Sequence, residues 1–186
     1  MKRIGYLYEK FISIDNLILA VKNATHNKKR RRGIVKDAYE NPEKYALKIQ
    51  RILERGIVFS PPHEKIRRER NKIRCIKVPR FYPDQIVHWA LMQVIDPVIN
   101  RGMYRYCCGS VVGRGTKGAR KAVQNFIKSD PRIKYVYKAD VHHFFASVDT
   151  EILKQKFRRV IKDAKILKII DGILDCGGNG LPIGFY

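Results

Sequence analysis

The chain has 186 residues, of which 45% are hydrophobic, and this is enough for one domain or slightly more with a buried core. Its 39 Lys and Arg exceed its 17 Asp and Glu, so the net charge is +22. This composition excludes a wholly disordered chain and favours a polyanionic partner, with nucleic acid ahead of an anionic membrane surface. No apolar stretch reaches the roughly 18 residues of a membrane span. We therefore predict a cytoplasmic protein with no membrane partner.

Neither the cysteines nor the histidines form a recognisable metal site. The four cysteines are Cys75, Cys107, Cys108 and Cys176. None forms a C-x-x-C pair, so we predict reduced and mostly buried thiols. The adjacent His142 and His143 point to opposite sides of an extended backbone. We assign them no role as metal ligands.

Capping residues predict two helices in the first third of the chain. Ser13 precedes an apolar-periodic run and predicts a helix over 13–25. Asn41, with a proline directly after it and a glycine at the far end, predicts a second helix over 41–56. The segment between them, HNKKRRRG at 26–33, is either a charged turn or a phosphate-contacting tip, and both interpretations remain open.

The middle of the chain changes character at residue 57. Short apolar stretches flank an Arg-rich centre over 57–78, which predicts a basic β-hairpin or two edge strands. Helical spacing resumes over 83–100, and Pro97 should bend or end that helix. A glycine-rich loop, GSVVGRGTKGAR, then opens a helix at about 116–128.

The last third begins with an alternating apolar segment that ends in an acid. The sequence IKYVYKAD predicts a strand over 133–140 that presents Asp140 at its tip. Two helices, at about 150–161 and 163–175, and a glycine-rich turn follow it. Helices mixed with a few short strands predict an α+β fold.

The sequence GRGTKG satisfies the pattern G-x-G-x-x-G and raises a dinucleotide-binding alternative. Its glycines are Gly113, Gly115 and Gly118, and an acid follows the third glycine after a predicted helix and strand. Against this alternative, the preceding RYCCGSVV is a poor buried strand. Arg114 and Lys117 also add charge where backbone amides usually hold the pyrophosphate.

Four ordered segments of the sequence are similar to a known family. YKADVHHFFASVDTEIL resembles the first catalytic motif of bacterial reverse transcriptases, and CGSVVGRGTKGA resembles the block before it. RCIKVPRFYPDQIVHWAL resembles an earlier block, and GLPIG resembles a later one. The resemblance covers residues 72–186 and is strongest to retroelement and prophage enzymes, including those of diversity-generating retroelements, with retron and group II intron enzymes as relatives.

This resemblance implies the fingers and the first part of the palm of a right-hand polymerase, mostly helical with a short antiparallel sheet. We expect a basic helical region at 1–56, the fingers at 57–132 and a partial palm at 133–186. The implied activity is RNA-directed DNA polymerisation by two-metal nucleotidyl transfer. The implied cofactor is Mg²⁺, and the implied partners are an RNA template, a DNA or RNA primer and dNTPs.

The resemblance also implies roles for individual residues. Asp140 binds both catalytic metals with help from the backbone carbonyl of Val141, and the ring of Phe145 excludes a 2′-hydroxyl. The implied dNTP-binding residues are Lys72, Arg74, Phe145, Ile183 and Gly184. The implied nucleic-acid-binding residues are Arg30, Arg31, Arg32, Arg114, Lys117 and Pro182.

The family supplies two further catalytic aspartates from a Y-x-D-D hairpin beyond the GLPIG block. This sequence has no adjacent Asp pair, so we expect an N-terminal portion of the enzyme, either an excerpt or a truncated gene, that does not polymerise alone. The alternatives are an RNA-binding remnant without catalysis and, less favoured, the dinucleotide-binding domain.

Overall fold

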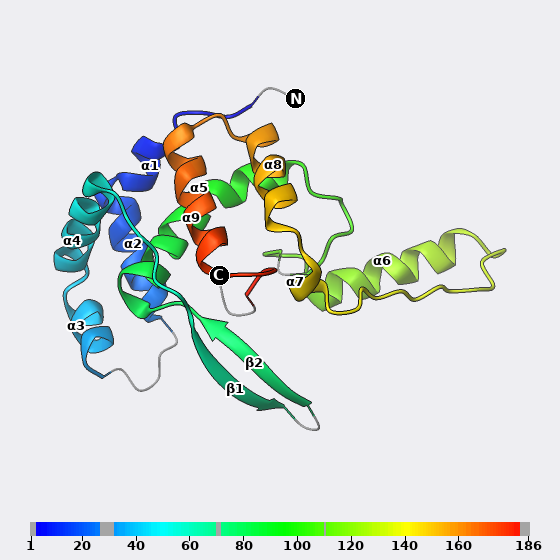
Figure 1. Ribbon diagram of the computed structural model, residues 1–186. Helices are drawn as coiled ribbons and strands as arrows, with labels where there is room; N and C mark the ends of the chain where they lie inside the picture. The colour runs from blue at the N-terminus through cyan, green and yellow to red at the C-terminus, as the bar shows by residue number, and fades with distance from the viewer. Residues whose placement is uncertain (1–2, 27–31, 70–71, 110, 183–186) are drawn as a thin grey trace. The chain divides into compact units, whose positions relative to one another are not determined.

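The structure is a computed structural model that describes residues 3–26, 32–69, 72–109 and 111–182 (Figure 1). Met1–Val98 and His143–Tyr186 together form one compact unit, and Ile99–His142 form a second. The described residues are mostly helical with one two-stranded antiparallel sheet, in agreement with the predicted α+β class. No helix among them is both long and apolar enough to cross a membrane.

The first unit begins with four helices that bury their apolar faces against one another. They are α1 (Tyr8–Ile12), α2 (Ile14–Thr25), α3 (Ile34–Glu40) and α4 (Pro42–Arg55). Ser13 caps α2 as predicted, since its hydroxyl accepts the N–H of Asn16 at 3.4 Å. Asn41 occupies the N-cap position of α4, as predicted, but its side chain makes no capping hydrogen bond. Its side-chain amide instead donates to the carboxylate of Asp37 at 2.8 Å, because a charged acceptor lies one turn upstream.

The core of this unit draws on helices from both ends of the chain. Phe11, Leu17, Ile49, Ile86 and Ile166 are fully buried. Burial of one such side chain stabilises the fold by roughly 1.5–3 kcal/mol. This core fixes the elements that carry the sequence blocks described above.

The basic segment forms the predicted hairpin, with β1 at His63–Glu69 and β2 at Lys72–Val78 (Figure 1). A π-helical turn, η1 at Phe81–Gln85, leads into α5 at Ile86–Arg101. Pro97 lies inside α5 and does not end it. A proline removes one backbone hydrogen bond, and the buried face of α5 continues past it with Val98.

Three helices complete the first unit: α7 (Phe144–Ser147), α8 (Thr150–Val160) and α9 (Ala164–Cys176). Asp149 caps α8 through the backbone N–H three residues later. Asp163 caps α9 through the N–H of Ile166 and also accepts the N–H groups of Leu7 and Tyr8, each at 3.0 Å. One carboxylate therefore joins the N-terminal segment to the last helix.

The second unit contains α6 at Gly115–Ser129, close to the predicted bounds. The predicted strand over 133–140 is wrong: this segment is coil in Figure 1, and it has no ladder partner among the described residues. Alternation marks a segment suited to a sheet, but a strand also needs a neighbour that offers backbone groups. Tyr135 and Tyr137 remain about nine-tenths exposed as a result.

The cysteine prediction is half confirmed. All four thiols are free, but Cys75 is exposed and the other three are only half-buried. Cys75 lies on the basic hairpin and Cys107 and Cys108 lie in the loop before α6, whereas Cys176 is the last residue of α9.

Candidate functional site

Three of the four sequence blocks meet in the first unit at the glycine-rich turn after α9. The N–H of Leu181 donates to the carbonyl of Phe145 at 2.7 Å. Gly180 has φ of 73°, and a Cβ placed on it would lie 2.5 Å from that same carbonyl oxygen. Only glycine fits here, because both the backbone conformation and the close approach exclude a side chain. The structure thus brings the GLPIG block against the block that contains Phe145.

The base of the hairpin also contacts this turn. The ammonium of Lys77, on β2, donates to the carbonyl of Gly177 at 3.2 Å. Pro182 is buried against Gly177, where a Cβ would lie 2.6 Å from its ring. Pro182, predicted to contact nucleic acid, therefore packs on the end of α9. We refer to the assembly of Lys77, residues 177–182 and Phe145 as the turn site.

The phenylalanine pair on α7 borders the turn site. Phe144 and Phe145 are each about half exposed, and their ring centroids lie 5.4 Å apart in an edge-on arrangement. An aromatic side chain that remains open to solvent can offer an apolar wall to a bound sugar or base. Phe145 alone of the two also contributes its backbone carbonyl to the turn.

A buried acid that the sequence analysis did not single out lies near the same turn. Asp84 is 1% exposed, and its carboxylate accepts the N–H of Ser60 at 3.3 Å. Burial raises its pKa above the ordinary value. Burial, with a smaller effect of the Asp84 charge, raises the pKa of the Cys176 thiol to about 11. Cys176 is therefore protonated at neutral pH and is not poised as a nucleophile.

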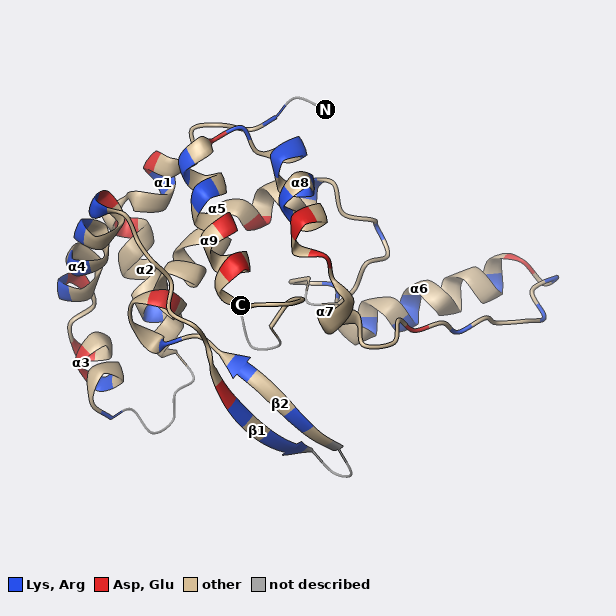
Figure 2. Ribbon diagram, viewed as in Figure 1, with Lys and Arg blue, Asp and Glu red and all other residues tan. Residues whose placement is uncertain are grey.

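Basic residues lie along both strands of the hairpin (Figure 2). On β1 they occur together with two glutamates, whereas β2 has no acidic residue. Arg67 on β1 lies directly opposite Arg74 on β2 in the ladder. Like charges in that position destabilise a strand pair. Arg74 is exposed as its predicted dNTP role requires, whereas the side chain of Lys72 lies outside the described part of the structure.

Asp140 and Val141 lie in the second unit, in an exposed segment. The N–H of Val141 donates to a carboxylate oxygen of Asp140 at 3.1 Å. Among the described residues there is no cluster of three or more His, Cys, Asp or Glu side chains able to hold a metal ion. Asp140 thus offers one exposed carboxylate in this segment, with Val141 as its hydrogen-bond donor.

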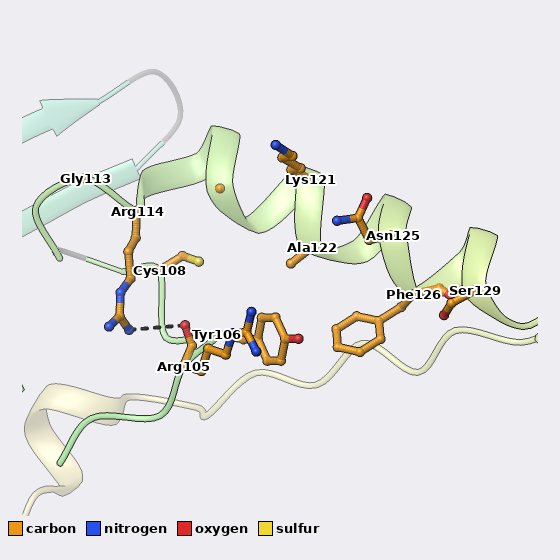
Figure 3. A pocket seen from close by; sticks show the side chains of 11 residues that line it. Arg105, Tyr106, Cys108, Gly113, Arg114, Lys121, Ala122, Asn125, Phe126 and Ser129 are labelled. Atoms are coloured by element: carbon orange, nitrogen blue, oxygen red, sulfur yellow. Dashed lines mark hydrogen bonds between the residues drawn. The ribbon is translucent and has the colours of Figure 1, made fainter. Parts of the chain in front are cut away.

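Arg114 braces the loop before α6, and its contact with a template stays a prediction. Its Nη1 donates to the backbone carbonyls of Tyr104, Arg105 and Cys107 at 3.0 to 3.2 Å (Figure 3). These bonds brace the loop before α6. Lys117 is exposed on α6 and remains available to a phosphate.

The remaining predicted residues divide between described and undescribed parts of the chain. Arg32 is exposed at the start of the segment before α3. Arg30, Arg31, Ile183 and Gly184 lie outside the described residues. Scans against protein-family models and curated proteins found no match. The resemblance to reverse transcriptases thus rests on the four sequence blocks.

Proposed function

We propose that the chain forms the fingers and first part of the palm of an RNA-directed DNA polymerase. The observation that carries this proposal is the turn site, where Leu181 N–H and Gly180 meet the carbonyl of Phe145. The blocks that contain these residues are 35 positions apart, and a shared nucleotide pocket explains why they should touch. The four ordered sequence blocks support the same assignment.

In this proposal Phe145 presents its half-exposed ring to the sugar of an incoming nucleotide. The resemblance assigns Pro182, Ile183 and Gly184 to the floor beneath the nascent base pair, and Pro182 is the one of them within the described residues. Arg74 and Lys72 meet the triphosphate, for which the planar and permanently charged guanidinium of Arg74 is well suited. The selection of deoxynucleotides then follows from the bulk of one aromatic ring.

Asp140, with the carbonyl of Val141, would contribute to holding Mg²⁺. The bound metal would neutralise charge that develops as a primer 3′-hydroxyl attacks the α-phosphate. The other catalytic carboxylates in this family come from a Y-x-D-D motif beyond the GLPIG block. The protein residues otherwise act by positioning the nucleotide and the strand.

The partners proposed are an RNA template, a primer and dNTPs. The net charge of +22 and the basic hairpin support a polyanionic partner. An RNA-binding protein without catalysis is the second candidate, since these charges require only a phosphate backbone. The dinucleotide alternative has little support, because the described residues around α6 form no strand on either side of it.

The test compares sugar selection by two neighbouring phenylalanines. In primer extension by the polypeptide that contains this chain, Phe145→Ala should allow incorporation of ribonucleotides that the wild-type protein rejects. Phe144→Ala is the matched control and should retain the preference for deoxynucleotides. If the two variants discriminate alike, Phe145 is not the sugar gate. If RNA is bound without any extension, the second candidate is the correct one.

A further inference from the structure

The second unit contains a cavity that none of the roles above uses. Its volume is about 470 Å³, within the roughly 300–1,000 Å³ of small-molecule sites. The walls come from the loop before α6 and from one side of that helix (Figure 3). Its lining includes Arg105, Tyr106, Lys121, Asn125 and Phe126.

Two aromatic rings form one wall of the cavity. The centroids of Tyr106 and Phe126 lie 4.9 Å apart with an interplanar angle of 63°, and both rings are partly exposed. The guanidinium of Arg105 lies 5.6 Å from the centre of the Tyr106 ring. Arg114 holds three carbonyls of this loop, so the wall is fixed before any ligand arrives. The wall therefore offers open aromatic surface next to a cation.

The charge around this cavity is strongly positive. Residues 99–142 contain ten Lys and Arg but only two acids, Asp130 and Asp140. Asp130 forms an ion pair with Arg132 at 2.9 Å. No acidic side chain lines the cavity, whereas Arg105 and Lys121 both do. A ligand with an aromatic part and an anionic part fits this arrangement.

We propose that the cavity binds one nucleotide of a single-stranded nucleic acid. The base packs on Tyr106 and Phe126, the adjoining phosphate contacts Arg105 and Lys121, and the Asn125 amide hydrogen-bonds the base edge. A base inside a duplex is stacked on its neighbours and cannot offer its face to these rings. The exposed Tyr135 and Tyr137 of the same unit give further stacking surface for the strand.

This inference rests on the proposed function only for the identity of the strand, which is then the template. Its chemistry is independent of catalysis, because it requires neither metal nor dNTP. The two proposals can thus fail separately. A protein that never extends a primer can still bind a single strand here, and a polymerase can lack this subsite.

The experiment uses a short single-stranded RNA that carries one thiouridine, in the absence of Mg²⁺. Fluorescence anisotropy measures its affinity, and photocrosslinking identifies the peptide that it contacts. Phe126→Leu keeps an apolar side chain and removes the ring. Lys121→Gln removes one charge from the cavity. Lys128→Gln removes the same charge from the same helix outside the cavity lining and is the matched control. A DNA strand of equal sequence and an RNA duplex form the other arms.

We expect Phe126→Leu to weaken binding by roughly tenfold, the size of one lost base–aromatic contact. Lys121→Gln should weaken it by a similar factor, because the bound phosphate loses its cation. Lys128→Gln should weaken it by less than about threefold, as an unspecific phosphate contact would. The crosslink should map to the peptide that contains Tyr106 or to the one that contains Phe126. The duplex should bind less tightly than either strand, and the RNA and DNA arms identify which sugar is preferred. Equal losses for Lys121→Gln and Lys128→Gln with no effect of Phe126→Leu would overturn the proposal, as would a crosslink elsewhere.

Discussion

Replacement of Gly180 by alanine tests the contact that unites two of the sequence blocks. Gly180 has φ of 73°, and its added Cβ would meet three backbone atoms of Phe145 and Ala146 at 2.5 to 2.8 Å. A non-glycine residue in this conformation costs roughly 1–2 kcal/mol. Overpacking against fixed backbone adds roughly 1–3 kcal/mol. The free energy of unfolding should therefore fall by about 2–5 kcal/mol in Gly180→Ala.

Gly178 provides the matched control within the same turn. Its φ is 74°, but the only atom near an added Cβ is the flexible ammonium of Lys77 at 3.8 Å. Gly178→Ala should therefore lose only the conformational part, roughly 1–2 kcal/mol. The difference between the two variants isolates the close approach of Gly180 to Phe145.

Urea unfolding followed by circular dichroism measures both losses. We expect Gly180→Ala to be clearly less stable than Gly178→Ala, with an unchanged dependence on urea. Equal losses would show that residue 180 does not pack on the Phe145 backbone. The turn site, and the observation that carries the proposed function, would then be incorrect.

Three further predictions follow from contacts elsewhere in the first unit. Asp163→Ala should lower the free energy of unfolding by roughly 2–4 kcal/mol, because three backbone N–H groups lose their acceptor. Asp149→Ala, which removes a single helix cap, should lower it by roughly 1 kcal/mol. Equal losses in urea unfolding would contradict this prediction. Burial lowers the pKa of His88 in the folded chain to about 4. As the pH falls below about 6.5, His88 is therefore protonated in the unfolded chain before it is protonated in the folded one. The free energy of unfolding should drop by about 2 kcal/mol between pH 7 and pH 5. That drop should vanish in His88→Gln, and an unchanged pH dependence would refute the assignment. Arg67→Gln should stabilise the hairpin by roughly 0.2–1 kcal/mol, since it removes the like charge opposite Arg74. The same variant should reduce the slope of the logarithm of the RNA-binding constant against the logarithm of the salt concentration by about 0.7–0.9. An unaltered slope in salt titrations would remove Arg67 from the RNA surface.

Local signals predicted most of the helices and the hairpin. Ser13 marked the start of α2, and the Arg-rich centre between apolar stretches marked β1 and β2. These features depend on residues within a few positions of one another. Asn41 shows where such reasoning fails, because the carboxylate of Asp37 attracts a side chain that the cap also needs.

Long-range contacts account for what the sequence did not predict. The alternation of 133–140 indicates a strand, but no strand partner for it exists among the described residues. The sequence did not predict that Arg114 binds three carbonyls of its own loop. The close approach of Gly180 to Phe145 likewise depends on two segments that meet only after folding.

The basic hairpin illustrates how local and distant effects combine. The sequence predicted its strands but not their register, which places Arg67 opposite Arg74. The sequence also gave no sign that Lys77 reaches the turn after α9. Register depends on the loop between the strands and on the surface that the hairpin contacts. Both are properties of the folded chain.

The most direct test of the account is primer extension on an RNA template by the polypeptide that contains this chain. The account predicts Mg²⁺-dependent incorporation of dNTPs that is lost in Asp140→Ala, while binding of the primer–template stays within about twofold of the wild-type protein. Extension that survives Asp140→Ala, or RNA binding without any extension in the wild-type protein, would contradict the assignment as an RNA-directed DNA polymerase.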